Sequence, residues 1–366
     1  MDFRVLTEIN SDECVYIAGP EVFYYTGVKK WAHMRLQAEA QGFMVAMPND
    51  TQILTNVEDD PHGFADEIFA NCARSINRTT ALIVDLEDFR GPVPDGGSIF
   101  ELGMAYARGA RCYAFSRDCR PAAEKDYHSK LVDGRIFDAS GLEHPHPFLP
   151  FSANVLGAAK LIEGTFSDSL KQFQSDLNWS RIHGEELCLN EEARGIELNP
   201  KGRPKKVYIS TAQRFASNNV AIFAELESIC SQRGLELITA LPDRESADPM
   251  ERAGNDFRAN IRALSEADLI ILDLNDYLGL EPNPDVAFEA GYAYQSGKYV
   301  RGFMSDTRDM LDRVPHHGVE LDQRDAVGRD VEFYEYPLNL MFASSMPILQ
   351  GEMKEAVATV LNEFVE

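Results

Sequence analysis

The most constraining feature of this sequence is a long internal repeat. Residues 81–109 and 269–297 align at a constant offset of 188, and 12 of the 29 aligned positions are identical. Average composition would give about two identities by chance. A shorter match precedes this segment in each copy, because the string VYI at 15–17 recurs at 207–209. Two copies with so long a period predict a pair of domains and not a solenoid.

Chain length agrees with two domains. The 366 residues are too many for one ordinary domain and suffice for two hydrophobic cores. We expect the first copy over residues 1–175, a linker over 176–205 and a second, diverged copy over 206–366. The linker assignment depends on weak apolar periodicity and on frequent Gly and Pro, as in NPKGRPKK at 199–206.

Each copy alternates short apolar runs with helical periodicity. In the first copy we expect strands over 14–18, 43–47, 81–86 and 112–115, and helices over 28–40, 64–76, 99–108 and 155–173. Apolar strands separated by helices are typical of a parallel sheet covered on both faces. The sequence therefore predicts two flavodoxin-like, doubly wound α/β domains in tandem. Ligands of such sheets bind beyond the carboxyl ends of the strands.

Composition excludes several classes of partner. The formal net charge is −24, which argues against a nucleic acid polymer. No apolar run is long enough for a membrane span, and the first residues lack the layout of a signal peptide. Six cysteines are scattered without C-x-x-C spacing, which indicates a reducing, cytoplasmic location without a structural metal. The phosphate-binding loops of ATPases and of dinucleotide-binding enzymes are missing, so we expect no cofactor.

A candidate nucleophile follows the Gly- and Pro-rich loop after the 81–86 strand. If a helix begins near Ser98, Glu101 lies in its first turn, where the helix dipole favours the ionised carboxylate by about 0.3–1 kcal/mol. An ionised carboxylate near a crevice suits attack on an electrophilic sugar carbon. The alternative is structural, because Ser98-x-x-Glu101 also fits a capping box. Phe-Glu-x-Gly recurs with Glu289, where Val286 replaces the capping serine.

Two segments of the first copy resemble nucleoside 2-deoxyribosyltransferases. They are YIAGPxVF at 16–23 and DLxxFRGxxPDxGxxFELG at 85–103. The resemblance covers most of the first copy, and the second copy matches more loosely. It extends to relatives that hydrolyse the N-glycosidic bond of nucleoside 5′-monophosphates.

The resemblance implies roles for four residues. Glu101 matches the nucleophile that takes C1′ of the 2-deoxyribose and releases the base. Tyr16 matches the tyrosine that hydrogen-bonds this glutamate, and Asp95 matches an acidic residue that holds the sugar hydroxyls. Asn154 resembles the asparagine that a neighbouring subunit donates across a dimer.

The sequence departs from the family pattern in both copies. The family's Asp or Asn that handles the proton of the departing base aligns with Cys72, next to Asn71, and with Asn260 in the second copy. A thiol with a pKa of about 8.5 is a poor general acid at neutral pH. In the second copy Asn283 replaces Asp95, and Pro284-Asp285 replaces two glycines, which removes backbone freedom. Asp285 is a candidate to take over the role of Asp95 there. We therefore expect the first copy to be catalytic, and whether the second copy is catalytic is left open.

Substrate contacts are assigned to residues that follow strands or match the family motifs. They are Gly19, Pro20, Phe23, Asp85, Arg90, Gly97, Ser98 and Asn154 in the first copy, and Tyr208, Asp273, Asp285 and Asn339 in the second. Arg90 meets a 5′-phosphate or a base edge, or is a solvated loop residue. Phe23 stacks on a nucleobase or packs in the core.

Duplication suggests that the copies serve as each other's partner. We expect a pseudo-twofold pair in which Asn339 completes the site of Glu101 and Asn154 that of Glu289. The alternative is that both asparagines are turn or cap residues. The paired copies could associate again into a homo-oligomer.

The expected activity is transfer of 2-deoxyribose between nucleobases through a covalent glutamyl intermediate. The partners are then a small nucleoside or nucleotide and a free nucleobase. Hydrolysis of a nucleoside 5′-monophosphate and a non-catalytic, nucleotide-binding sensor are the alternatives. The charge of −24 disfavours a doubly charged nucleotide unless a residue such as Arg90 offsets it.

Overall fold

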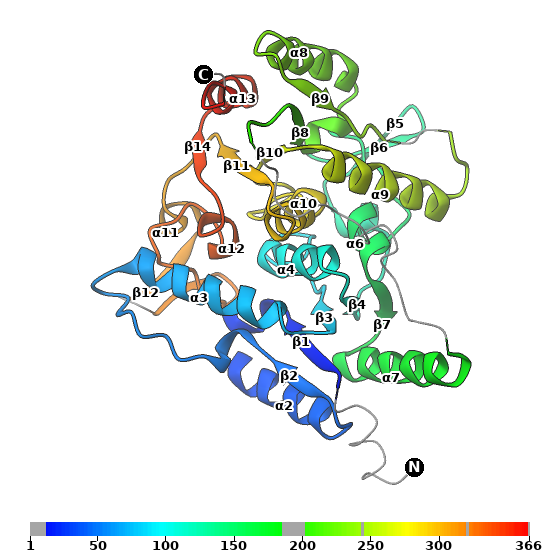
Figure 1. The fold of residues 1–366 in the computed structure, drawn as a ribbon, viewed down its shortest axis with the longest axis vertical. Helices are drawn as coiled ribbons and strands as arrows, with labels where there is room; N and C mark the ends of the chain where they lie inside the picture. The colour runs from blue at the N-terminus through cyan, green and yellow to red at the C-terminus, as the bar shows by residue number, and fades with distance from the viewer. Residues whose placement is uncertain (1–11, 185–201, 243–244, 320–321, 365–366) are drawn as a thin grey trace.

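The computed structural model describes residues 12–184, 202–242, 245–319 and 322–364. It contains two five-stranded parallel sheets, one in each copy (Figure 1). The strand orders are β2-β1-β3-β4-β7 and β9-β8-β10-β11-β14, which correspond strand for strand. The predicted pair of doubly wound α/β domains is therefore confirmed.

The first copy contains these elements. The sheet strands are β1 (Cys14–Ala18), β2 (Met44–Ala46), β3 (Ala81–Asp85), β4 (Arg111–Ser116) and β7 (Lys160–Glu163), and β5 (Lys130–Val132) and β6 (Arg135–Phe137) form a hairpin. The helices are α2 (Gly27–Glu39), α3 (Pro61–Ile76), α4 (Gly96–Ala107), α5 (Ala122–Lys125), α6 (Ala153–Ala158) and α7 (Phe166–His183), with 3₁₀ turns η1 (Pro20–Phe23) and η2 (Pro48–Asp50).

The second copy repeats this order. The sheet strands are β8 (Lys206–Ser210), β9 (Glu236–Ile238), β10 (Leu269–Asp273), β11 (Tyr299–Met304) and β14 (Ile348–Gln350), and β12 (His316–Val319) and β13 (Asp322–Asp325) form a hairpin. The helices are α8 (Asn219–Ser231), α9 (Pro249–Glu266), α10 (Pro284–Gln295), α11 (Met310–Arg313), α12 (Leu340–Ala343) and α13 (Met353–Asn362), with the 3₁₀ turn η4 (Ala212–Phe215).

The predicted helix over residues 155–173 is wrong. The chain there forms the end of α6, then strand β7 beside β4, and then α7. Gly164, with φ at +151°, separates strand from helix, and Thr165 and Asp168 form a capping box that starts α7. Helix α7 continues through residue 175 to His183. Residues 185–201 of the expected linker lie outside the described residues.

The two copies share one hydrophobic core. Helices α4 and α10 lie side by side between the sheets, and every residue of α4 is buried (Figure 1). A Cβ on Gly103 would overlap the carbonyl oxygen of Phe288, and one on Gly291 would overlap that of Phe100. The backbones of α4 and α10 can approach so closely only because these positions lack side chains.

The loops after β3 and β10 also meet between the copies. Arg90 and Leu278 occupy equivalent positions and both have positive φ, 51° and 52°. A Cβ on Gly91 would lie 2.5 Å from the carbonyl oxygen of Leu278, and a Cβ on Gly279 would overlap the carbonyl oxygen of Arg90. The amide of Leu280 donates to the carbonyl of Arg90 at 3.1 Å. At the helices and at the loops, a glycine of each copy thus packs against the backbone of the other copy.

Among the described residues, no helix has both the length and the apolar character needed to cross a membrane. The same part of the chain holds no group of three or more His, Cys, Asp or Glu side chains suited to a metal ion.

Candidate active site

Helix α4 begins earlier than the sequence suggested. Asp95 is its N-cap, and the Asp95 Oδ2 atom accepts hydrogen bonds from the amide of Ser98 at 2.8 Å and from its hydroxyl at 2.6 Å. Glu101 therefore lies beyond the first turn. The capping-box interpretation is wrong, because Ser98 serves Asp95 and the Glu101 carboxyl turns elsewhere.

Glu101 is a buried carboxyl group with few polar partners. Its side chain receives a hydrogen bond from the Tyr16 hydroxyl, at the carboxyl end of β1, and a further contact from the Cys72 thiol of α3. Burial raises its pKa to about 8, although the hydrogen bond from Tyr16 acts in the opposite direction and Asp95 adds to the rise. The expectation that the helix dipole keeps Glu101 ionised is wrong. Near neutral pH the unliganded site holds a proton on Glu101 for much of the time.

Glu101 opens into a cavity that both copies line. The first copy contributes Gly19, Val22, Phe23, Trp31, Pro48, Ile68, Cys72, Asp95, Gly97, Ser98 and Glu101, and the second contributes Glu332, Tyr334, Asn339, Leu340 and Met341. The walls are mainly apolar and aromatic, and the described residues that line them include three carboxyl groups and no Lys, Arg or His. This composition suits an uncharged, partly aromatic ligand.

The structure brings many of the predicted residues to this cavity. Gly19, Phe23, Asp95, Gly97, Ser98 and Asn339 line it together with Glu101, and Tyr16 reaches it through its contact with Glu101. Pro20 and Asp85 do not line it. Asp85 accepts a hydrogen bond from the amide of Glu87 and shares a buried acid pair with Glu21.

Asn339 lies close to the first turn of α4. A Cβ on Gly97 would be 2.7 Å from the Asn339 side-chain amide, and the Asn339 Oδ1 atom accepts from the amide of Met341 at 2.9 Å. The expected importance of Gly96 and Gly97 therefore has a different cause. Neither has a positive φ, so the lack of a side chain and not backbone freedom lets the partner copy approach. The N-cap role expected as an alternative is also real, since Asn339 caps α12.

Arg90 does not reach the cavity that holds Glu101. Its guanidinium is buried among second-copy groups, 3.8 Å from Glu281 and from Asp325, and it donates to the carbonyl of Asp330 at 2.7 Å. Glu281 in turn accepts the amide of Gly96, in the first turn of α4, at 3.0 Å. Arg90 thus joins the two copies and is not a solvated loop residue.

The corresponding site of the second copy is occupied by an arginine. Arg214, on η4, lies 3.0 Å from the Glu289 carboxylate and 3.2 Å from that of Asp285, and donates to the Tyr208 hydroxyl at 2.9 Å. Asn154 of the first copy also donates to Glu289 at 2.9 Å. Glu289 is therefore held by Arg214 in a buried network, whereas Val22 stands at the position equivalent to Arg214 in the first copy.

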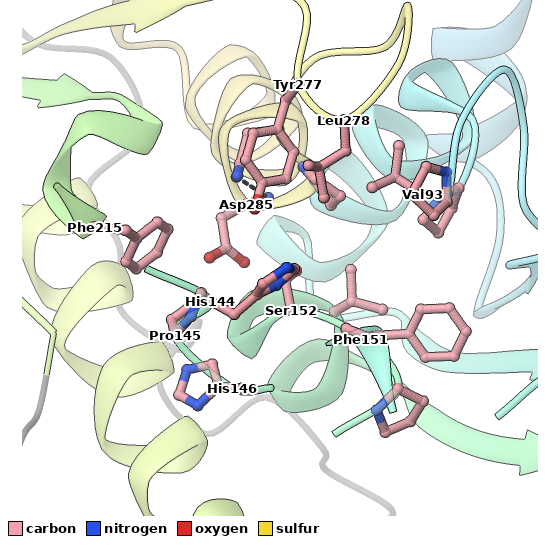
Figure 2. A pocket seen from close by; sticks show the side chains of 17 residues that line it. Val93, His144, Pro145, His146, Phe151, Ser152, Phe215, Tyr277, Leu278 and Asp285 are labelled. Atoms are coloured by element: carbon pink, nitrogen blue, oxygen red, sulfur yellow. Dashed lines mark hydrogen bonds between the residues drawn. The ribbon is translucent and has the colours of Figure 1, made fainter. Parts of the chain in front are cut away.

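A second cavity borders this network at Asp285. Figure 2 shows Phe215, Tyr277 and Asp285 of the second copy facing His144, His146 and Phe151 of the first across it. Glu289, Tyr208 and Asp273 are not among its lining residues. Asp273 instead accepts from Thr211 at 2.7 Å and from Asn275 at 2.6 Å. The second copy thus has a cavity from which its glutamate is shut off.

Sequence reasoning missed Arg214 and the two second-copy carboxyls near the first site, Glu281 and Glu332. Arg214 had a usable signal, because aligning Phe215 with Phe23 sets Arg214 against Val22, which lines the first cavity. The two glutamates had none, since only the packing of the copies brings them to the first site.

Arg214 gives a direct test of the closed network. Replacing it with Leu leaves two buried carboxylates without their cation, so we expect a loss of about 3–5 kcal/mol in unfolding free energy. Thermal unfolding measures this. Adding Asp285→Asn and Glu289→Gln to Arg214→Leu removes both charges and should recover much of the loss. An unchanged melting temperature in the single variant would contradict the buried ion pairs.

Fold and site define an α/β protein with a buried glutamate at the carboxyl end of a parallel sheet, in a cavity completed by a second copy. A family model described as nucleoside 2-deoxyribosyltransferase matches residues 15–172 and 207–341, one match in each copy. The chain belongs to the nucleoside 2-deoxyribosyltransferase family. The family assignment is thereby confirmed for both copies.

Two solved structures are similar to part of this chain. A 2-desoxiribosyltransferase from Leishmania mexicana is 26% identical over 43% of this chain and 98% of its own, with a TM-score of 0.36. A conserved protein from Enterococcus faecalis V583 is 17% identical over the same shares, with a TM-score of 0.29. No match was found among curated proteins.

Proposed function

We propose that the first copy cleaves the N-glycosidic bond of 2-deoxynucleosides and transfers 2-deoxyribose to another nucleobase through Glu101. The observation that carries this proposal is the Glu101 carboxyl group, held by Tyr16 and open to a largely apolar cavity. The chain's membership of the deoxyribosyltransferase family supports the same chemistry.

Two displacements at one carbon account for the reaction. The Glu101 carboxylate attacks C1′ and the base departs. A second base then attacks the glycosyl-enzyme, and the configuration at C1′ is retained. The Tyr16 hydroxyl orients the attacking carboxyl and lowers its pKa toward the working range. The hydrophobic cavity limits the entry of water, which would otherwise compete with the second base.

Unpartnered polar atoms on the cavity support binding of a nucleoside. The Asp95 Oδ1 atom and the Trp31 indole N–H are buried without a hydrogen-bond partner. We assign Asp95 Oδ1 to a sugar hydroxyl and the indole N–H to an acceptor on the substrate, because buried polar groups are normally hydrogen-bonded. Phe23 and Tyr334 provide faces for the base.

We favour a nucleoside over a nucleoside 5′-monophosphate as the substrate. A phosphate carries about two negative charges and would enter a cavity that has three carboxyl groups and no cationic lining residue. Arg90, the candidate cation, is taken by Glu281 and Asp325.

The second copy serves as the intramolecular partner in this proposal. It supplies Asn339 and the neighbouring wall of the cavity, in a pseudo-twofold arrangement with the first copy. Its own glutamate, Glu289, is held by Arg214 and Asn154 and does not catalyse.

The decisive assay supplies deoxyinosine as donor and adenine as acceptor. We expect deoxyadenosine to form, with little release of free sugar when adenine is left out. Deoxyinosine 5′-monophosphate should react at least about tenfold less efficiently, because its charge is unmatched. Cleavage that proceeds equally without adenine would indicate a hydrolase. Binding of deoxyinosine without any product would indicate a sensor.

A further inference from the structure

Once Glu101 is assigned to C1′ and Asp95 to a sugar hydroxyl, the described cavity lining of the first copy leaves no carboxyl group to protonate the departing base. Cys72 lines the cavity, but burial raises the pKa of its thiol well above the ordinary value, so it gives up a proton reluctantly. Asn71 does not substitute for it. Its side chain bonds the Thr51 carbonyl and Arg74, and it is not among the residues that line the cavity.

A carboxyl group of the second copy lies in the same cavity. Glu332 lies between β13 and α12 and is 8% exposed. Its Oε1 atom accepts the amide of Leu340 at 3.3 Å, and its Oε2 atom is buried without a hydrogen-bond partner. A buried carboxyl oxygen that lacks a partner on the wall of a ligand cavity indicates that the ligand supplies one.

The surroundings of Glu332 favour its protonated form. Burial raises its pKa to about 7, and the charge of Asp95 adds to this, while Arg90 and the Leu340 amide act in the opposite direction. The acidic Glu281 and the phenol of Tyr334 also interact with it electrostatically. Near neutral pH the group therefore exists in both protonation states, as an acid–base catalyst requires.

We propose that Glu332 of the second copy is the general acid and base for the nucleobase at the Glu101 site. This role rests on the proposed transferase function. As the Glu101 oxygen bonds to C1′, the electron pair of the C1′–N bond passes to the base. The carboxyl proton of Glu332 goes to a ring nitrogen of that base, and Glu332 becomes a carboxylate. In the second displacement Glu332 takes a proton back from the incoming base, which completes the cycle.

The first copy has no carboxyl group at the position equivalent to Glu332. The turns at Asp138 and Asp325 have matching hydrogen bonds, with each Oδ1 atom accepting two following amides. The amides of Glu143 and Asp330, five residues later, donate to the carbonyls of Phe215 and Phe23 in the opposite copy.

At the same offset, Glu332 corresponds to Pro145 in the first copy, which lines the second cavity. The cavity of Glu101 thus has a carboxyl group at this position, and the second cavity has a proline, whose side chain cannot donate a proton.

The test compares deoxyinosine with its N7-methylated derivative in wild type and Glu332→Gln. Hypoxanthine departs easily only if it gains a proton. The N7-methylated base is already cationic in the nucleoside, so it departs as a neutral molecule without gaining one. Glu332→Gln should lower kcat/KM for deoxyinosine about 100-fold or more and leave the methylated substrate within about threefold of wild type. Equal losses on both substrates, or no loss on deoxyinosine, would overturn the role of Glu332.

The pH profile gives a second readout. Wild-type kcat/KM for deoxyinosine should peak between about pH 7 and 8, because Glu101 must be ionised and Glu332 protonated. In Glu332→Gln the decline on the alkaline side should vanish, which a purely structural role would not cause.

A matched control keeps folding defects apart from chemistry. Glu281→Gln removes another buried second-copy carboxyl that also interacts with Arg90 but does not line the cavity, so it should change both substrates alike. If wild type cleaves neither nucleoside, the proposed function itself fails. If wild type cleaves both and Glu332→Gln shows no selective loss, only the role of Glu332 fails.

Discussion

Replacing Glu101 with Gln is expected to lower the rate of deoxyribosyl transfer by a factor on the order of 10⁴ or more. The amide can still accept the hydrogen bond from Tyr16 but cannot attack C1′. Because the Glu101 side chain is buried and uncharged for much of the time near neutral pH, the variant should fold as well as wild type. The measurement is the initial rate of deoxyadenosine formation from deoxyinosine and adenine.

The duplicated sequence provides the control. Glu289→Gln makes the same change at the equivalent position, and we expect less than about a twofold change in transfer rate. Comparing the two variants identifies the copy that carries the transfer activity, because both residues lie at the same helical position of the same fold. Full activity in Glu101→Gln, or loss of activity only in Glu289→Gln, would show that the nucleophile is assigned to the wrong copy.

The fold was largely predictable because its signals are local. Buried parallel strands such as β1 and β3 are continuous apolar runs, and the expected bounds of β1 agree with the structure. The error at residues 155–173 arose because β7 is a short strand of mixed polarity, KLIE, whose pairing with β4 is a tertiary effect. A four-residue strand between two helices has little periodicity of its own.

Site residues were predictable only where they belong to a sequence motif within one copy. Tyr16, Asp95 and Glu101 come from motifs within the first copy, and the structure brings them together. The protonation of Glu101 was not predictable, because it depends on burial beneath the second copy and not on position along the helix. Glu332 was not predictable either, because it belongs to the second copy and reaches the cavity only through the packing of the two copies.

The asymmetry of the two sites is the clearest gain from the structure. Substitutions in the second copy at Asn283 and Asp285 indicated divergence, but they did not reveal that Arg214 fills the site. Asp285 does not replace Asp95 as a free carboxylate, because it pairs with Arg214 and accepts the amide of Asn154 at 3.0 Å. In the proposed function, a copy whose glutamate is held in buried ion pairs is suited to be a rigid partner.

Gly103→Ala should be among the most destabilising single-atom additions available in this chain. The new Cβ would overlap the carbonyl oxygen of Phe288, a backbone atom of a buried helix that cannot move aside as a side-chain end can. We expect the free energy of unfolding to fall by about 3 kcal/mol or more, which is at the upper end of what overpacking a core costs. Transfer activity should also be lost, because the part of the second copy that lines the Glu101 cavity would be displaced. Gly254→Ala in α9 is the control, because its Cβ meets nothing nearer than Arg258 at 3.4 Å and Ala is favoured over Gly inside a helix by up to about 1 kcal/mol. Equal melting temperatures for the two variants would contradict the close packing of α4 against α10.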